Sequence, residues 1–173
     1  MSNLDITAYN RQGKVFTAAN TAAVALTAVA ATTTGLILIN PYGSGVKMVL
    51  VDWGYASSVV ATGVGNLGMA MMASNQTAVT NTTPITVLTA DGSGSGASKG
   101  KASSSVTLPA AAVANKWVGG NIWTTGGTGD HPYMWNGTFE GSVILVPGAA
   151  YHFTIVTTVM TGLGSFTWIE VPV

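Results

Sequence analysis

The chain contains no cysteine among its 173 residues. Disulfide bonds and thiolate metal sites are therefore excluded, and folding is not tied to a redox compartment. Charged residues are also scarce: they make up 7% of the sequence, against about a quarter in an ordinary soluble domain. A surface with so little charge tends to associate, so we expect much of it to be covered by neighbouring molecules.

The few charges balance, with six basic and six acidic side chains. A protein that binds nucleic acid through its phosphates needs a basic surface, so we do not expect a nucleic-acid partner. We expect no membrane helix either, because threonines, an asparagine and a glycine interrupt the most apolar stretch, residues 18–39. Residues 1–20 lack the apolar region of a signal peptide, which predicts that the protein is made in a cytoplasm and either kept there or released by lysis.

Short segments rich in β-branched and aromatic residues, separated by glycine and proline, are the main local signal. No segment carries a strong helical pattern. The sequence predicts an all-β fold, a β-sandwich or jelly roll of about eight antiparallel strands. The segments that carry the pattern are residues 14–18, 21–34, 36–39, 47–55, 64–73, 85–90, 106–125, 139–146, 151–159 and 166–173.

The stretch 35–56 organises this prediction. Two apolar segments flank residues 40–45, in which Pro41 fixes its own φ while Gly43 and Gly45 accept positive φ. The sequence therefore predicts an antiparallel hairpin at this point.

Both faces of the first of these strands are apolar. Leu36 and Leu38 would point to one side, and Ile37 and Ile39 to the other. We expect one face to pack on the protein's own second sheet and the other to be covered by another protein.

Two further patterns indicate core positions. Tyr151, Phe153 and other apolar residues alternate with polar ones, His152 among them, over residues 151–159. Trp53 and Trp168 lie on expected strands and are core candidates.

The expected domain plan has one domain and one arm. Residues 1–13 show no periodicity and are expected to form an extended N-terminal arm, followed by a single domain of residues 14–173. Such an arm can add a strand to a neighbour's open sheet edge, so we expect residues 1–20 to reach another chain. Residues 91–105, rich in glycine and serine, predict a flexible exposed loop.

Motifs for catalysis or metal binding are absent from the sequence. His131 follows Asp130 in a glycine-rich segment, but no Gly-x-Ser-x-Gly turn accompanies the pair. The close spacing typical of zinc ligands is also absent among Asp130, His131, Glu140 and His152. We expect no enzymatic activity, no cofactor and no metal. An enzyme that uses His131 and His152 as metal ligands is kept as one alternative function. Metal analysis of the purified protein would test it.

Carboxylates for glycoside hydrolysis are the remaining enzymatic option. Asp52 and Glu170 lie within expected strands. A single acid in such a place more often protects an edge strand or contacts another subunit.

Loop aromatics are the best candidates for external contacts. Residues 126–136 form an irregular glycine-rich segment that contains Tyr133 and Trp135, and Trp123 precedes it. Tryptophan and tyrosine are enriched where proteins bind partners, and their rings also stack on sugars.

Several features recur together: a polar N-terminal arm, a strand running into Asn-Pro-Tyr-Gly-Ser-Gly at 40–45, a long Gly/Ser segment, Val-Pro-Gly at 146–148 and Trp-Ile-Glu-Val-Pro at 168–172. This combination resembles small structural proteins of tailed bacteriophages, in particular capsid decoration (cement) proteins. The resemblance implies a trimer on the outer capsid surface of the virion, which bridges neighbouring major capsid subunits. It identifies no individual binding residue.

The main hypothesis is thus a virion subunit that binds its own copies and the major capsid protein. The alternative is a carbohydrate- or receptor-binding virion tip that uses loop aromatics. The candidate contact residues lie on the arm, on the second face of residues 36–39 or in the loop; they are Leu4, Ile6, Tyr9, Arg11, Ile37, Ile39, Tyr133 and Trp135.

Overall fold

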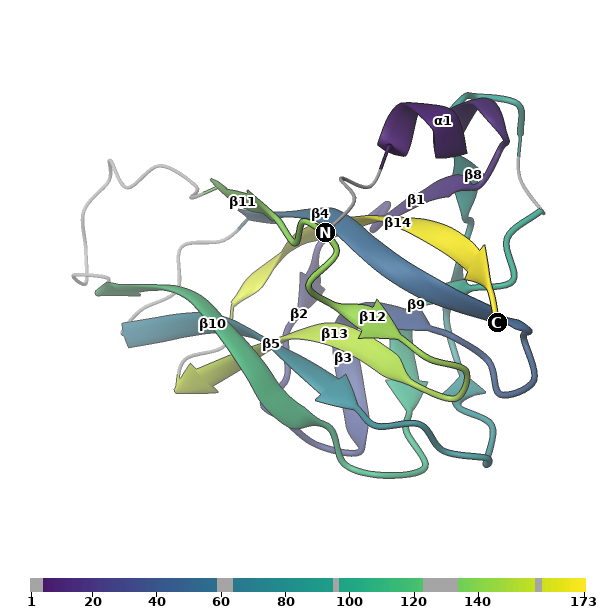
Figure 1. Ribbon diagram of the computed structural model, residues 1–173. Coiled ribbons are helices and arrows are strands. Elements are labelled where there is room, and N and C mark those ends of the chain that lie inside the picture. The colour runs from purple at the N-terminus through teal and green to yellow at the C-terminus, as the bar shows by residue number, and fades with distance from the viewer. Residues whose placement is uncertain (1–4, 59–63, 95–96, 123–133, 158–159) are drawn as a thin grey trace.

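The computed structural model describes residues 5–58, 64–94, 97–122, 134–157 and 160–173. Within them, one short helix accompanies two antiparallel sheets that pack face to face (Figure 1). The predicted all-β sandwich is confirmed.

Sheet A has the strand order β11-β4-β14-β1-β8, with β12 beside β4 and β2 beside β14. The long strand β14 lies between β1 and β4 and pairs with both. The strands of sheet A are β1 (Val15–Ala19), β2 (Val24–Ala25), β4 (Val46–Ser57), β8 (Leu88–Thr89), β11 (Met134–Thr138), β12 (Ile144–Leu145) and β14 (Thr161–Pro172).

Sheet B has the strand order β10-β5-β13-β3-β9-β6, with β7 beside β9. Its central strand β13 pairs with β5 and β3. The strands of sheet B are β3 (Thr32–Ile39), β5 (Val64–Met72), β6 (Thr80–Asn81), β7 (Pro84–Ile85), β9 (Lys101–Thr107), β10 (Val113–Ile122) and β13 (Ala150–Thr157).

The predicted hairpin of β3 and β4 is wrong. β3 belongs to sheet B and β4 to sheet A, so residues 40–45 carry the chain from one sheet to the other. The expected backbone of the turn is present, since Gly43 and Gly45 have φ angles of 78° and 72°. Turn residues reverse the chain, but they do not decide which strands pair.

Asn40 holds this corner in place. Its side chain is fully buried, and Nδ2 donates to the main-chain oxygens of Val46 and Leu145, each at 2.8 Å. Its Oδ1 accepts a hydrogen bond from Ser44 Oγ at 2.7 Å. One amide thus joins β3, the turn, β4 and β12.

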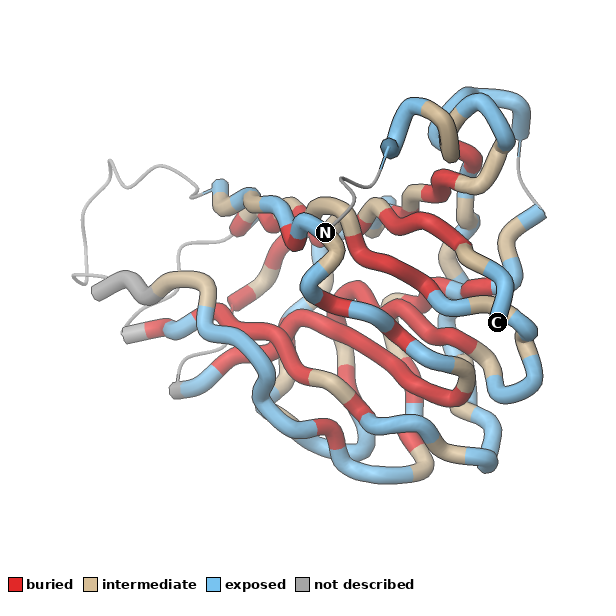
Figure 2. Tube along the Cα trace, in the orientation of Figure 1, coloured by how far each residue is buried: buried red, intermediate tan, exposed pale blue. Residues whose placement is uncertain are grey.

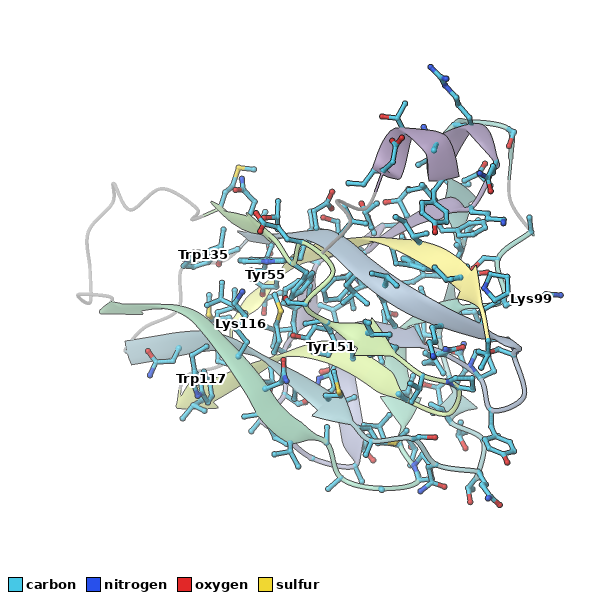
Figure 3. All side chains as sticks on the ribbon, viewed as in Figure 1. Tyr55, Lys99, Lys116, Trp117, Trp135 and Tyr151 are labelled. Atoms are coloured by element: carbon cyan, nitrogen blue, oxygen red, sulfur yellow. The ribbon has the colours of Figure 1, made fainter. Side chains whose placement is uncertain are left out.

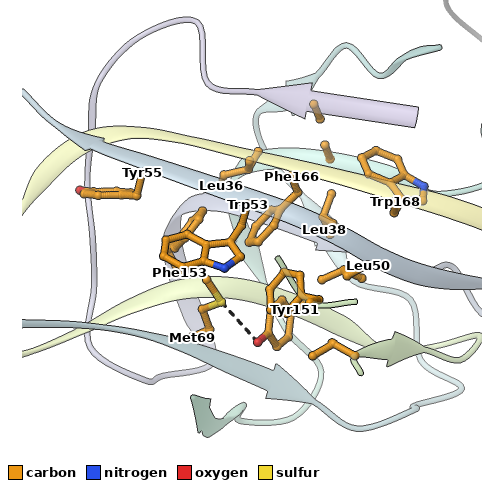
Figure 4. Close-up of a cluster of buried hydrophobic side chains, with 14 of the residues drawn as sticks. Leu36, Leu38, Leu50, Trp53, Tyr55, Met69, Tyr151, Phe153, Phe166 and Trp168 are labelled. Carbon is orange, nitrogen blue, oxygen red and sulfur yellow. Dashed lines mark hydrogen bonds between the residues drawn. The ribbon is translucent and has the colours of Figure 1, made fainter. Parts of the chain in front are cut away.

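The main core fills the space between the sheets, and burial follows the middle of the strands (Figures 2 and 4). Trp53 and Trp168 are buried there, as predicted. The rings of Phe153 and Phe166 stack across the sandwich with centroids 4.6 Å apart. Tyr151 shares this core face with Phe153 and Ile155, so the predicted alternation is confirmed over residues 151–155; residues 158 and 159 lie outside the described residues.

Ile37 and Ile39 do not lie on a face open to another protein. Both are buried in a second cluster on the far side of sheet B, which the chain's own Leu108 and Ala112 complete. Val29 also contacts this cluster, and Leu108 N donates to Ala31 O at 2.8 Å. The need for cover was predicted correctly, but this chain supplies it.

The N-terminal segment also differs from the expectation. Residues 6–11 form the helix α1 (Ile6–Arg11) instead of an extended arm. Asp5 caps it by accepting a hydrogen bond from Ala8 N at 3.0 Å. Tyr9 packs on the outer face of sheet A. Since β1 lies between β14 and β8, the part of 1–20 within β1 is not available to a neighbour.

Several other boundaries shift. The expected loop 91–105 contains the start of β9, whose serine-rich sequence gave little strand signal. Of residues 21–34, only β2 and the start of β3 are strand. The strand expected at 139–146 is reduced to β12, whereas β11 begins within the expected loop 126–136 and continues to Thr138.

Candidate functional site

One edge of the sandwich concentrates exposed aromatic and apolar side chains. Among the described strands, β10 ends sheet B and β11 ends sheet A, and the two come together at this edge. Val113 and Trp117 on β10 and Met134 on β11 are exposed. This edge is therefore the candidate functional site.

Trp135 packs between the two sheets at this edge. It pairs with Tyr55 of β4, and the two rings lie 6.2 Å apart. A side-chain carbon at Gly119 of β10 would come within 2.9 Å of the indole Nε1, so Trp135 reaches across to sheet B. The sequence-based expectation of a free loop aromatic does not hold for Trp135, which is half-buried on a strand and packed on the main core.

Trp117 has the opposite orientation. It lies on the outer face of sheet B and is 52% exposed, and Figure 3 shows it on the side of β10 and β5 away from Tyr55 and Trp135. Its ring rests on Gly68, where a methyl group would lie 2.6 Å from Cε3 and 2.7 Å from Cζ3. Two irregularities in the pairing of β10 with β5, on either side of the Lys116–Trp117 pair, set this direction.

A shallow groove of about 470 Å³ runs along Trp117. Asn66 and Val156 pair across β5 and β13 and form its other wall, with Val118 and Gly119 beside the tryptophan. None of the described residues that line it carries a charge. The groove therefore offers one aromatic face, one amide and two aliphatic side chains.

The cation next to Trp117 points elsewhere. Lys116 places its Nζ 5.6 Å from the centroid of the Phe139 ring, on the core side of the edge. Asn115, in the first irregularity, accepts a hydrogen bond from Tyr151 Oη at 3.1 Å. Burial raises the pKa of Tyr151 well above its ordinary value, so the hydroxyl remains a neutral donor.

Glu170 is not available for acid–base chemistry. It is buried in β14 at the centre of sheet A. Its carboxylate accepts hydrogen bonds from Ser98 Oγ at 2.6 Å, Gly100 N at 2.8 Å and Lys99 N at 3.0 Å. The expectation of an edge guard or a subunit contact is therefore wrong: this carboxylate anchors the segment that leads into β9.

His152 is equally enclosed. Its Nδ1 donates to Phe153 O at 2.8 Å and lies 3.2 Å from Thr33 Oγ1. Its Nε2 is buried and has no hydrogen-bond partner among the described residues. Burial lowers the pKa of His152, so the imidazole is neutral at physiological pH. The second predicted candidate, His131, lies outside the described residues.

Within the described ranges, no three His, Asp or Glu side chains gather closely enough to hold a metal ion. In the same part of the chain, no helix has the length and apolarity needed to cross a membrane.

The remaining contact candidates are spread over the molecule. Ile6 and Arg11 of α1 are exposed, whereas Tyr9 packs against Val15 and Ile169. Leu4 and Tyr133 lie outside the described residues. The structure therefore does not bring these candidates together, and it adds Trp117, which sequence reasoning placed on a strand without assigning it a role.

Comparison with known proteins gives no match: no family model, no curated protein and no solved structure is significantly similar to this chain.

Proposed function

We propose that this chain is a structural subunit of a virus particle, a capsid decoration protein that binds its own copies and bridges subunits of the major capsid protein. The observation that carries the proposal is the contrast between charge and apolar exposure. The chain has twelve charged side chains (6 + 6). Eleven large apolar side chains are exposed in its described part alone. A subunit that is covered by neighbours accounts for both.

The strand order supports this proposal. Apart from β9, which extends sheet B beyond β3, the described strands of five or more residues are eight; in chain order they are β1, β3, β4, β5, β10, β11, β13 and β14. When these eight strands are numbered 1 to 8 along the chain, the strand order is 6-3-8-1 in sheet A and 5-4-7-2 in sheet B. This succession is typical of a jelly roll, a fold found in many viral capsid proteins.

An apolar row on the outer face of sheet A ends in an exposed side chain that could make such a contact. Ile144, Val49, Ile169 and Val15 are register partners across β12, β4, β14 and β1, so they point to the same outer face. Tyr9 covers one end of the row, while Ile144 at the other end is exposed. Val15, Val49 and Ile169 are buried within the chain, so Ile144 is the member of the row that a neighbouring molecule could cover.

Two measurements test the proposal. Light scattering of the purified chain should give the mass of an oligomer, and the chain should sediment with shells of the major capsid protein encoded by the same genome. A monomer that stays in the supernatant would overturn the proposal. Removal of residues 1–13 is the appropriate test of the N-terminal segment, because it leaves β1 intact.

A glycan-binding virion tip is the second candidate. It no longer rests on Trp135, which packs inside the edge. Trp117 favours it instead, because its ring is exposed beside an amide.

A further inference from the structure

We propose that the Trp117 groove binds the pyranose ring of a neutral sugar. This inference rests on the second candidate function and names its ligand class, and it holds or fails independently of capsid binding. It rests on the orientation of one ring, on the glycine beneath it and on the chemistry of the groove walls.

The tryptophan is held as a platform. Gly68 removes the side chain that would lift the indole from the sheet, since any Cβ there would overlap Cε3 and Cζ3. The ring is thereby supported by the backbone of β5 while about half of the side chain remains exposed. A supported aromatic ring loses little conformational freedom when a flat ligand stacks on it.

The walls of the groove complement a sugar. A pyranose ring has a face of C–H groups that packs on an aromatic ring, and a rim of hydroxyls that need hydrogen-bond partners. Asn66 is exposed and supplies both an amide donor and an acceptor, and Val156 adds an apolar contact. Ligand sites commonly combine aromatic surface with a few polar groups of this kind.

The lack of charged side chains in the groove distinguishes a neutral sugar from other ligands that stack on tryptophan. Nucleic-acid bases also stack, but their phosphates require basic side chains. The nearest cation in the chain sequence, Lys116, is directed at Phe139 on the core side. An acidic sugar would lack a counter-charge for the same reason. A protein partner would need about 800 Å² of contact, whereas five of the described residues line this groove.

The test uses the full chain and two matched panels of oligosaccharides. One panel contains neutral glucose, galactose, mannose and N-acetylglucosamine oligomers, and the other contains sialylated and sulfated forms. We expect a neutral oligosaccharide to bind, as measured by titration calorimetry. Trp117→Ala should weaken binding about tenfold or more, as expected for the loss of one stacking contact. Tyr42→Ala, which removes an exposed aromatic elsewhere, should leave it unchanged.

A second variant keeps the tryptophan and moves it. Gly68→Ala should displace the indole and reduce binding without removing the ring, and circular dichroism would confirm that the sheet is retained. The proposal is overturned if no neutral sugar binds at millimolar concentration, if only the acidic panel binds, or if Trp117→Ala binds like the parent. Loss of oligomer mass in Trp117→Ala without any sugar binding by the parent would identify the groove as a protein contact instead.

Discussion

Glu170 shows how one buried carboxylate can order a segment that its composition marks as flexible. Glycine- and serine-rich sequence predicts a mobile loop, yet Ser98, Lys99 and Gly100 all donate to this side chain. Trp168 Nε1 also lies 3.4 Å from it. Sequence reasoning missed the anchor because acceptor and donors are some 70 residues apart in the chain.

Glu170→Gln replaces one acceptor oxygen by a donor that faces other donors. We expect the free energy of unfolding to fall by about 1–3 kcal/mol, the cost of buried unsatisfied groups. The amides of Lys99 and Gly100 should also exchange faster with solvent, since they lose their acceptor. Urea denaturation and hydrogen exchange would measure both effects.

Glu140→Gln is the matched control, because Glu140 is exposed. Equal stability of the two variants would show that the carboxylate of Glu170 contributes no more than a surface charge does.

His152 should make stability depend on pH. The unfolded chain takes up a proton on this imidazole as the pH falls through about 6.5, whereas burial lowers the pKa in the folded protein. The unfolded state then binds more protons, so the free energy of unfolding falls as the pH drops from 7 to 5. Denaturation curves across this range should show the slope, and His152→Gln should reduce it.

His131→Gln provides the comparison for this experiment, since it removes the only other histidine. A slope that disappears in His131→Gln and persists in His152→Gln would contradict the assignment.

The orientation of the Trp117 side chain could not be predicted from the sequence. Its strand was predicted, but its direction depends on Gly68 of a partner strand and on two pairing irregularities. Gly68 is distant from Trp117 in the sequence. By contrast, the burial of Trp53 followed from its place on a predicted strand rich in β-branched and aromatic residues.

At the scale of elements, the corner between β3 and β4 should depend on Asn40. Asn40→Ala leaves the main-chain oxygens of Val46 and Leu145 without their donor. We expect a loss of about 1–3 kcal/mol in the free energy of unfolding. Asn40→Asp should cost more, because a carboxylate would face two carbonyl oxygens. Urea midpoints would rank the variants.

An exposed asparagine gives the reference. Asn136→Ala on β11 removes an amide from an exposed side chain, so its midpoint should match the parent. If Asn40→Ala also matched the parent, the corner would not depend on this side chain.

Strand faces were easier to predict than strand partners. Alternation along 151–155 identifies the core side of β13, because the side-chain period of a strand is two residues. The hairpin error at 40–45 has a simple origin: a turn that crosses between sheets uses the same proline and glycines as one that pairs neighbours. β9 escaped notice because lysine, alanine and serine carry little strand preference.

At the scale of the whole molecule, the proposed association should resist salt. A contact built on apolar side chains is weakened little by screening and strengthened by sulfate. Light scattering should therefore give the same oligomer mass in dilute buffer and in about 1 M sodium chloride. Dissociation at high salt would point to an interface held by the few charges instead.

The apolar row of sheet A can be tested in the same way. Ile144→Lys places a charge at its exposed end and should reduce oligomer mass or capsid binding. Leu88→Lys, at a similarly exposed position on β8 at the other edge of the sheet, should have no effect. If both variants assemble like the parent, the contact lies on another surface.

The position of β14 also has a consequence for biosynthesis. Because Thr161–Pro172 lies between β1 and β4, a nascent chain still short of that strand holds two halves of sheet A with no partner between them. The native state can form only after those residues have emerged from the ribosome, and until then the open edges of β1 and β4 are exposed to aggregation. A premature stop codon ahead of Thr161 should accordingly yield inclusion bodies instead of a shortened native protein.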